Sequence, residues 1–174
     1  MKKQILSLIL FLTTIIGQSQ ELFWETSIDK AIEVSNKTNK PMLMFFTGSD
    51  WCGWCIRLQK EVLKTPEFAT WAKENVVLVE LDYPRRTPQT DQIKAQNQQL
   101  QQVFGIQGYP TICFANASLK EGKINFEQIG KTGYVAGGPS EWLKGAEEIL
   151  KNNTKKVQKA TKKDKKQEKK NKKK

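Results

Sequence analysis

The sequence of 174 residues predicts one α/β domain, in which a central mixed β-sheet is flanked by helices. The run 42–46 is continuously apolar and the run 76–81 is apolar except for Glu80, as expected of strands that are covered on both faces. Two further strands are expected at 112–115 and 124–129, and helical segments separate the first three strands. Elements that alternate in this way are typical of a sheet sandwiched between helices.

The helices of the first half begin at recognisable capping residues. One helix follows Thr26 or Ser27 and ends at 39–41, where the sequence is Asn-Lys-Pro. The turn at 47–50 leads out of the first strand into a second helix. A third helix begins at 65–67, where a capping Thr, a first-turn Pro and a first-turn acid follow one another.

The second half contains a helix, a hairpin and a last helix. A helix is expected from about Thr90, within a polar, Gln-rich stretch. The turn at 120–123 joins the two last strands as an antiparallel hairpin. Ser140 caps a last amphipathic helix, whose apolar side can cover the sheet. That side carries Trp142, Leu143, Ala146, Ile149 and Leu150.

The excess positive charge lies outside the predicted domain. The chain carries 29 Lys and Arg against 18 Asp and Glu, a formal net charge of +11. Residues 151–174 hold 13 Lys and two acidic residues, which accounts for the whole excess, whereas residues 20–150 carry −2. No apolar period continues beyond Lys151, so we expect a domain at 20–150 and a disordered Lys-rich tail at 151–174. The tail suits an anionic envelope surface, and the lack of interleaved aromatic residues argues against nucleic acid.

The N-terminus has the pattern of a secretory signal peptide. Lys2 and Lys3 precede an apolar run at 5–16, and the small residues Gly17 and Ser19 fit cleavage after position 19. The run is too short to span a hydrocarbon core of about 30 Å, although an uncleaved anchor is the alternative. Residues 1–19 are therefore predicted to be a signal peptide, and the protein to be exported to the periplasm or secreted, where thiols oxidise readily.

Two cysteines separated by two residues carry the predicted chemistry. The segment Trp51-Cys52-Gly53-Trp54-Cys55 lies between the first strand and the second helix. Cys52 falls at the helix N-terminus, where free N–H groups and the positive end of the dipole favour the thiolate that attacks a disulfide. Cys55, one turn further on, can release the substrate from the mixed disulfide and is expected to be less exposed. Asp50 is expected to be a solvated turn residue.

Other interpretations of the cysteines are weaker. The chain has no His, which excludes imidazole catalysis, and a zinc site would need two more ligands where only Cys113 is available. A purely structural disulfide between Cys52 and Cys55 would close a very short loop and add little stability. Cys113 itself is expected to be a small buried hydrophobe, and the alternative is a third redox thiol near Cys52.

Two motifs together resemble the thioredoxin superfamily. They are Cys52-Gly53-Trp54-Cys55 after an apolar strand and the segment 104–111, Phe-Gly-Ile-Gln-Gly-Tyr-Pro-Thr, which matches the second motif of that family. The resemblance covers about residues 22–150 and implies a thioredoxin-like fold. The Gly48–Trp51 lead-in and Lys40-Pro41 are similar to exported bacterial thioredoxin-like proteins.

The resemblance implies roles for individual residues. It makes Cys52 the nucleophile and Cys55 the resolving thiol, and it implies a cis peptide bond between Tyr109 and Pro110. In the fold that bond lies against the CxxC, and the backbone before the Pro pairs with an extended substrate. The predicted substrate-binding residues are Trp51, Gly53, Trp54, Tyr109, Pro110 and Thr111. Trp51 could equally pack in the core.

The sequence departs from the family pattern at two positions. Members often hold a buried acid six residues before the first Cys, where this chain has Phe46. Glu80, Asp82 or water could move the proton instead. In addition, Trp54 replaces the Pro or His that frequently precedes the second Cys and helps to set the redox potential.

The predicted function is thiol–disulfide exchange on protein disulfides in the cell envelope. A reductase is favoured, because the residues that precede Cys52, Gly48–Trp51, resemble those of exported reductants. No bound cofactor is required, but a redox partner must return the cysteine pair to its starting redox state. The alternatives are a disulfide oxidase or isomerase, and a non-catalytic binding or chaperone-like module that uses the basic tail.

Overall fold

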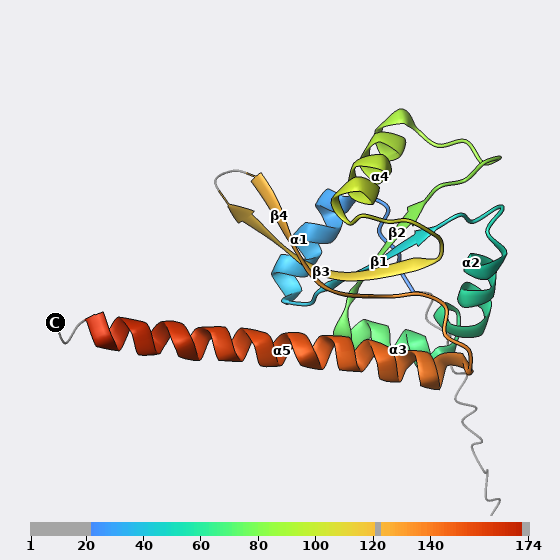
Figure 1. Cartoon of the computed structure of the whole chain (residues 1–174). Coiled ribbons are helices and arrows are strands. Elements are labelled where there is room, and N and C mark those ends of the chain that lie inside the picture. Colours follow the sequence, from blue (N-terminus) through green and yellow to red (C-terminus); the bar gives the residue numbers. More distant parts are fainter. Residues whose placement is uncertain (1–21, 121–122, 172–174) are drawn as a thin grey trace, which may run out of the picture.

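The computed structural model describes residues 22–120 and 123–171 and confirms the α/β fold class. The predicted order of helices and strands is present, and Figure 1 labels most of the elements. The elements are α1 (Ile28–Thr38), β1 (Met42–Thr47), α2 (Gly53–Leu58), the π-helical segment η1 (Gln59–Leu63), α3 (Pro66–Asn75), β2 (Val77–Asp82), α4 (Asp91–Val103), β3 (Thr111–Lys120), β4 (Lys123–Thr132) and α5 (Gly138–Asn171). The predicted signal peptide at 1–19 lies outside the described residues.

The sheet is mixed, with strand order β2-β1-β3-β4. β1 pairs in parallel with β2 and antiparallel with β3, and β3 pairs antiparallel with β4. All six residues of β1 are buried, as its unbroken apolar run predicts. β3 and β4 are longer than the predicted strands, because the sequence signal ends where the hairpin becomes polar while the pairing continues to Lys120 and Lys123.

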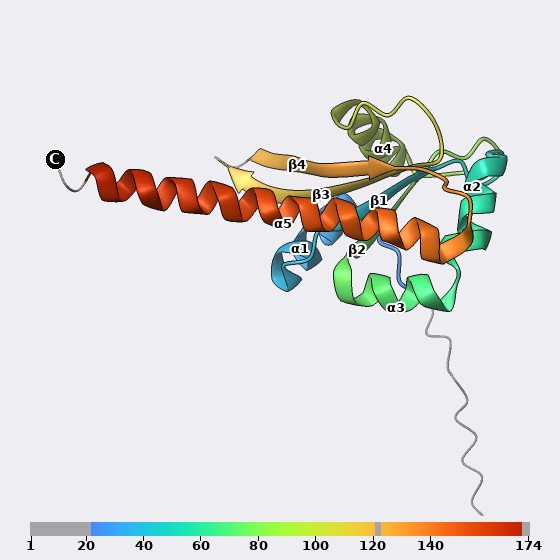
Figure 2. The same ribbon diagram turned by 60° about the horizontal axis from the view of Figure 1, so that its bottom comes forward.

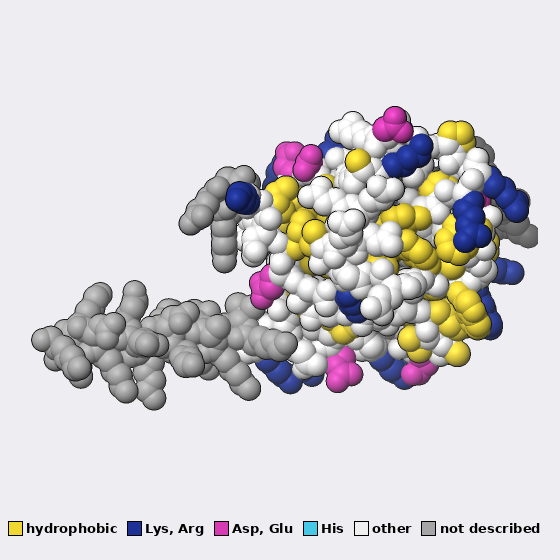
Figure 3. Space-filling view, turned by 45° about the horizontal axis from the view of Figure 1, so that its top comes forward, with side chains coloured by type: hydrophobic (Ala, Val, Ile, Leu, Met, Phe, Trp, Pro, Cys, Tyr) yellow, Lys and Arg dark blue, Asp and Glu magenta, His cyan; other side chains and the backbone are white. Residues whose placement is uncertain are grey.

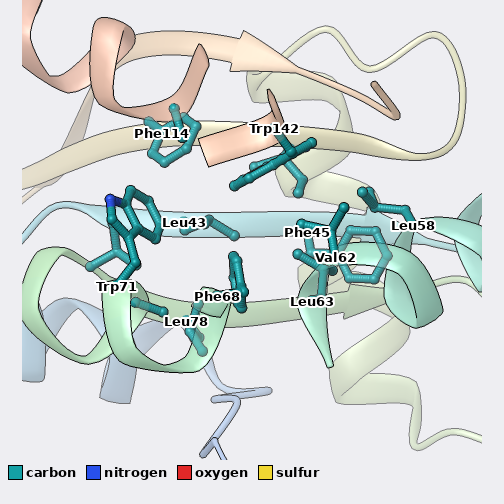
Figure 4. Close-up of a cluster of buried hydrophobic side chains, with 14 of the residues drawn as sticks. Leu43, Phe45, Leu58, Val62, Leu63, Phe68, Trp71, Leu78, Phe114 and Trp142 are labelled. Carbon is teal, nitrogen blue, oxygen red and sulfur yellow. The ribbon is translucent and has the colours of Figure 1, made fainter. Parts of the chain in front are cut away.

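The two faces of the sheet carry separate cores. On one face, alternate β1 residues such as Leu43 and Phe45 pack with residues of α2, η1, α3 and α5 (Figure 4). Phe68 and Trp142 meet edge to face in this cluster, with ring centroids 5.7 Å apart. On the other face, Met42, Met44 and Phe46 pack against α1 and α4.

Figure 3 shows a face on which the exposed hydrophobic side chains form several patches interspersed with polar atoms.

The last helix differs from the prediction of a disordered tail at 151–174. α5 runs from Gly138 to Asn171, beside the β3–β4 hairpin and past it (Figures 1 and 2). Its first turns are held by Trp142 and Ala146, which are buried in the core. Residues 151–171 contain no Gly or Pro and are rich in Lys, which favours helices, so the loss of the apolar face does not end the helix.

None of the helices within residues 22–120 and 123–171 combines the length and the apolar character that a membrane span needs.

Candidate active site

Cys52 and Cys55 form a disulfide at the point where β1 gives way to α2. Their Cα atoms are 5.2 Å apart. Cys52 is the N-cap of α2, as predicted, and Cys55 lies in its first turn. Cys52 is 6% exposed whereas Cys55 is fully buried, so the first cysteine is the one that solvent reaches. The predicted difference in exposure is confirmed.

A backbone N–H group at the helix start points at the Cys52 sulfur. The Cys55 N–H donates a hydrogen bond to Cys52 Sγ at 3.2 Å. The Cys52 N–H donates to the Gly48 carbonyl at 2.9 Å, which closes the turn before the helix. Because the free N–H groups of a helix start favour negative charge, this position stabilises a thiolate whenever the disulfide is reduced.

Gly48 is required by the close approach of an indole ring. A Cβ atom at this position would lie 2.4 Å from the Trp51 ring, a distance that no side chain tolerates. The absence of a side chain at Gly48 therefore lets Trp51 fold back over the turn that precedes Cys52.

Trp51 is held on three sides. Its indole N–H donates to the Tyr83 carbonyl at 2.8 Å, and its ring meets Tyr109 edge to face with centroids 5.8 Å apart. The Arg85 guanidinium lies over the ring, 3.9 Å from its centroid. Trp51 is half-buried, so it both packs against the core and lines the surface beside Cys52.

A carboxylate ties the turn before Cys52 to the loop after β2. Asp50 accepts hydrogen bonds from the backbone N–H groups of Arg85 at 3.0 Å, Arg86 at 2.7 Å and Thr87 at 3.0 Å. These bonds, the Arg85 one foremost, lower the pKa of Asp50. Asp50 is a turn residue, as expected, but it does more than contact solvent, because its hydrogen-bond partners lie 35 or more residues further along the chain.

Trp54 belongs to a second cluster, which it forms with Tyr134 and with residues of α2 and η1. Its ring lies 5.2 Å from that of Tyr134, and the Arg57 guanidinium is 5.4 Å from the Trp54 centroid and 5.0 Å from the Tyr134 centroid. Glu61 joins the cluster, since it forms an ion pair with Arg57 at 2.7 Å and accepts a hydrogen bond from the Tyr134 hydroxyl at 2.6 Å. Trp54 remains 56% exposed, so the cluster presents an apolar surface next to Cys55.

The Tyr109–Pro110 peptide bond is cis, as the resemblance implies. Tyr109 contacts Trp51 and lies 5.1 Å from the Tyr83 ring, and burial raises the pKa of its phenol. A Cβ on Gly133 would come within 3.2 Å of the Pro110 carbonyl, so the end of β4 lies directly beside the proline. Thr111 starts β3, and its hydroxyl donates to the Gly108 carbonyl at 2.7 Å.

The two acidic residues that could accept the proton, Asp82 and Glu80, have different surroundings. Phe46 faces the core opposite to the dithiol. Both Asp82 oxygens accept from Ser49, one from its N–H at 2.8 Å and one from its hydroxyl at 2.6 Å. Glu80 instead lines a cavity of about 240 Å³ with Phe45 and other residues, and burial, followed by the Asp82 charge, raises its pKa.

Cys113 lies away from the dithiol. It is fully buried and belongs to the core on the opposite face of the sheet from the cluster of Cys52 and Cys55. Burial raises the pKa of its thiol to about 11. The structure therefore supports a small buried hydrophobe rather than a third redox thiol.

Several residues of the site were missed in the sequence. The arginines and tyrosines around the dithiol belong to no motif. Arg57 follows Cys55 on α2, and the others lie in loops that meet only in the fold: Tyr83, Arg85, Arg86 and Tyr134. One signal was available, since the chain contains only three Arg among its 29 basic residues. A Cβ atom added at Gly53 would meet no other atom within 4 Å, so there is open space beside Cys52.

A family model described as thioredoxin-like matches residues 23–117, and the chain belongs to this family. Disulfide bond reductase DsbH of Chlamydia pneumoniae is 35% identical over 130 residues, which cover 75% of this chain and 74% of the relative. Thioredoxin-related protein DsbJ of the same organism is 34% identical over 119 residues, which cover 68% of this chain and 33% of the relative.

Solved structures agree with this assignment. A DsbH oxidoreductase superposes with a TM-score of 0.66 at 35% identity, over 75% of this chain and 85% of that one. A thioredoxin from Thermus thermophilus shares the fold, with a TM-score of 0.53 at 19% identity over 74% and 87% of the two chains. With its Cys52–Cys55 pair, the protein is a thiol–disulfide oxidoreductase of the thioredoxin superfamily.

Proposed function

We propose that this oxidoreductase reduces disulfides of proteins in the cell envelope. The observation that carries the proposal is the asymmetry of the dithiol: Cys52 alone reaches the surface, and its sulfur lies at a helix start with the Cys55 N–H directed at it. The name of the relative, a disulfide bond reductase, supports the reducing direction.

In the proposed cycle the dithiol form begins the reaction. The Cys52 thiolate attacks one sulfur of a substrate disulfide, which forms a mixed disulfide and releases the other substrate sulfur as a thiolate. Cys55, as its thiolate, then attacks Cys52 Sγ. This step releases the second substrate thiol and leaves the Cys52–Cys55 disulfide of the structure. Two electrons have moved to the substrate. A dithiol partner then reduces the Cys52–Cys55 disulfide by the same exchange and is itself oxidised to a disulfide.

The substrate segment is proposed to lie across the half-buried and exposed residues around Cys52. Trp51 and Tyr109 form one wall, and Trp54 forms the other. Gly53 leaves room between them. The backbone at Pro110 and Thr111 would pair with an extended substrate, and no cofactor takes part.

The proposed location is the envelope, with residues 1–19 as a cleaved signal peptide and residues 20–150 as the redox domain. The Lys-rich end at 151–174 is proposed to hold the protein at an anionic surface through salt-sensitive attraction. Sedimentation with vesicles of anionic or neutral lipid tests this, since chains that end at residue 150 should lose a preference for anionic vesicles. Equal binding of both chains would contradict it.

The catalytic proposal is tested with the pre-reduced protein and a disulfide-bonded protein substrate. Cys52→Ala should abolish reduction, Cys55→Ser should accumulate the mixed disulfide, and the matched control Cys113→Ala should retain activity. Trapped chains identify both the substrates and the resetting partner. Survival of reduction in Cys52→Ala would refute the proposed nucleophile.

The direction of electron flow is tested by the reduction potential. A reductase should equilibrate with glutathione at a potential near the thioredoxin value of about −270 mV, and a strong oxidant near about −120 mV. A value close to the second, together with oxidation of reduced substrates, would make the protein an oxidase instead. Loss of the biological effect on deletion of residues 151–174, but not in Cys52→Ala, would favour a non-catalytic binding module.

A further inference from the structure

All three arginines of the chain lie around the dithiol, although every other basic residue is Lys. Arg57 follows Cys55 on α2, and Arg85 and Arg86 lie in the loop of residues 83–87, here called the arginine loop. Figure 1 places α2 and the loop after β2 at the end of the molecule opposite to the C-terminus of α5. Basic and hydrophobic side chains lie side by side at that end (Figure 3).

The arginine loop is fixed through its backbone, which leaves its charged side chains available. The Asp50 carboxylate is occupied by the N–H groups of Arg85, Arg86 and Thr87. The Tyr83 carbonyl accepts the Trp51 indole N–H. Hydrogen bonds of its backbone therefore hold the loop against the turn that precedes Cys52, in addition to the contact of the Arg85 guanidinium with Trp51.

The three arginines differ in how their charge is compensated. Arg57 is paired with Glu61 at 2.7 Å. Within the part of the chain that the structure describes, neither Arg85 nor Arg86 forms an ion pair, and both side chains are exposed. The charge of Arg86 contributes to the lowered pKa of Asp50, but only after the backbone bonds.

Arg85 is oriented for recognition by its position over Trp51. A guanidinium that covers an aromatic ring is held by the π-system while the N–H groups at its edge stay free for a carboxylate. Trp51 directly precedes Cys52, so a substrate segment whose disulfide reaches Cys52 Sγ must pass close to this edge.

We infer that Arg85 and Arg86 recognise carboxylates, and that the preferred substrates carry Asp or Glu next to the reactive cysteine. The inference rests on the proposed reductase function and adds its substrate class. It follows from charge complementarity, because this loop carries two guanidinium groups that form no ion pair among the described residues, and one of them lies over Trp51, the residue before Cys52. Figure 1 shows the Lys-rich end of α5 at the opposite end of the molecule from this loop.

The inference is tested with two disulfide peptides of equal length, one with Asp and Glu flanking each cysteine and one with Asn and Gln there. The pre-reduced full chain should reduce the acidic peptide with the higher kcat/KM, and the preference should shrink as salt is added. One exposed ion pair changes a rate by about two- to fivefold, so Arg85→Met with Arg86→Met should lower kcat/KM for the acidic peptide by roughly tenfold.

Met is chosen because it keeps an apolar cover over Trp51. The matched control, Lys30→Met with Lys37→Met on α1, removes the same charge from exposed positions away from the site and should leave the preference intact. The double arginine variant should lose less activity on the neutral peptide than on the acidic one, so that the ratio of the two kcat/KM values falls towards one.

Three results would overturn the inference. Equal rates for the two peptides, or an equal fall for both in the arginine variant, would show that the guanidinium groups act on Cys52 or on packing instead. The same loss of preference in the lysine control would show a general charge effect. If the parent chain reduces neither peptide, the proposed reductase function fails and the substrate class fails with it, which is distinct from reduction without preference.

Discussion

The Trp51 indole N–H donates a 2.8 Å hydrogen bond to the Tyr83 carbonyl, and this bond joins the turn before Cys52 to the loop after β2. Asp50 makes the same connection one residue earlier, through three backbone N–H groups. Two consecutive residues therefore fix the arginine loop to the helix start that carries the nucleophile. This connection explains how a loop that begins 32 residues after Trp51 in the sequence becomes part of the site.

Removal of the Asp50 carboxylate should loosen the arginine loop. In Asp50→Ala the amides of Arg85, Arg86 and Thr87 lose their acceptor, so we expect their hydrogen exchange to accelerate at least tenfold while amides in β1 are unchanged. Native-state exchange measured by NMR checks this. Unchanged protection at the three amides would mean that other contacts hold the loop.

The same carboxylate should make the loop sensitive to acid. Backbone hydrogen bonds lower the pKa of Asp50 below its ordinary value of 3.8. A depressed pKa means that the stabilisation is complete above the ordinary pKa and is lost as the pH falls through the folded one. The difference in unfolding free energy between the parent and Asp50→Ala should therefore shrink below about pH 4. Urea titrations at pH 3 and pH 6 measure it.

Substitution of Gly48 should displace Trp51. An Ala side chain would require a Cβ atom 2.4 Å from the indole ring, so the ring or the turn must move. We expect Gly48→Ala to cost about 1–3 kcal/mol, as overpacking does, and to change the environment of Trp51. Denaturant unfolding and tryptophan fluorescence report the two effects. Gly53→Ala is the matched control, because its Cβ meets open space.

Glu80 should destabilise the fold when it is charged. Burial raises its pKa above the ordinary value of 4.5, so its favourable contribution is present at low pH and is lost as the pH rises through the folded pKa. Glu80→Gln should therefore raise the melting temperature at pH 7 and leave it nearly unchanged at pH 3. A lower melting temperature at pH 7 would show that the Glu80 charge is compensated in the cavity.

Much of the fold follows from local patterns, whereas much of the site does not. The run Met42–Phe46 predicts a buried central strand, and Cys52 at a helix start predicts the dithiol geometry. Arg85 and Tyr134 carry no such signal, because their contacts with Trp51 and Trp54 depend on loops that meet only after the sheet has formed. The length of α5 was missed for a different reason, since apolar periodicity detects packing and residues 151–171 form helix without an apolar face.

Cys113 should be chemically inert in the native protein. Its thiol is fully buried, and its pKa of about 11 keeps it protonated at neutral pH, so two factors suppress the thiolate that reacts with alkylating agents. Reduced native protein should take up label at Cys52, and Cys113 should react only after denaturation. Mass spectrometry of digested samples separates the sites. Rapid native labelling of Cys113 would reopen its role as a redox thiol.

The C-terminal part of α5 should be dispensable for folding. The helix is attached through Trp142 and Ala146, which are buried, and through Ile149, whose side chain lies against Gly130. Lys151 and Lys155 are already exposed. A chain that ends at residue 155 should therefore keep its urea midpoint and its rate of disulfide reduction. Trp142→Ala is the contrasting variant and should cost about 3–5 kcal/mol, because it opens a cavity beside Phe68 and Trp71. A large loss of stability in the shortened chain would show that residues 156–174 contribute to folding.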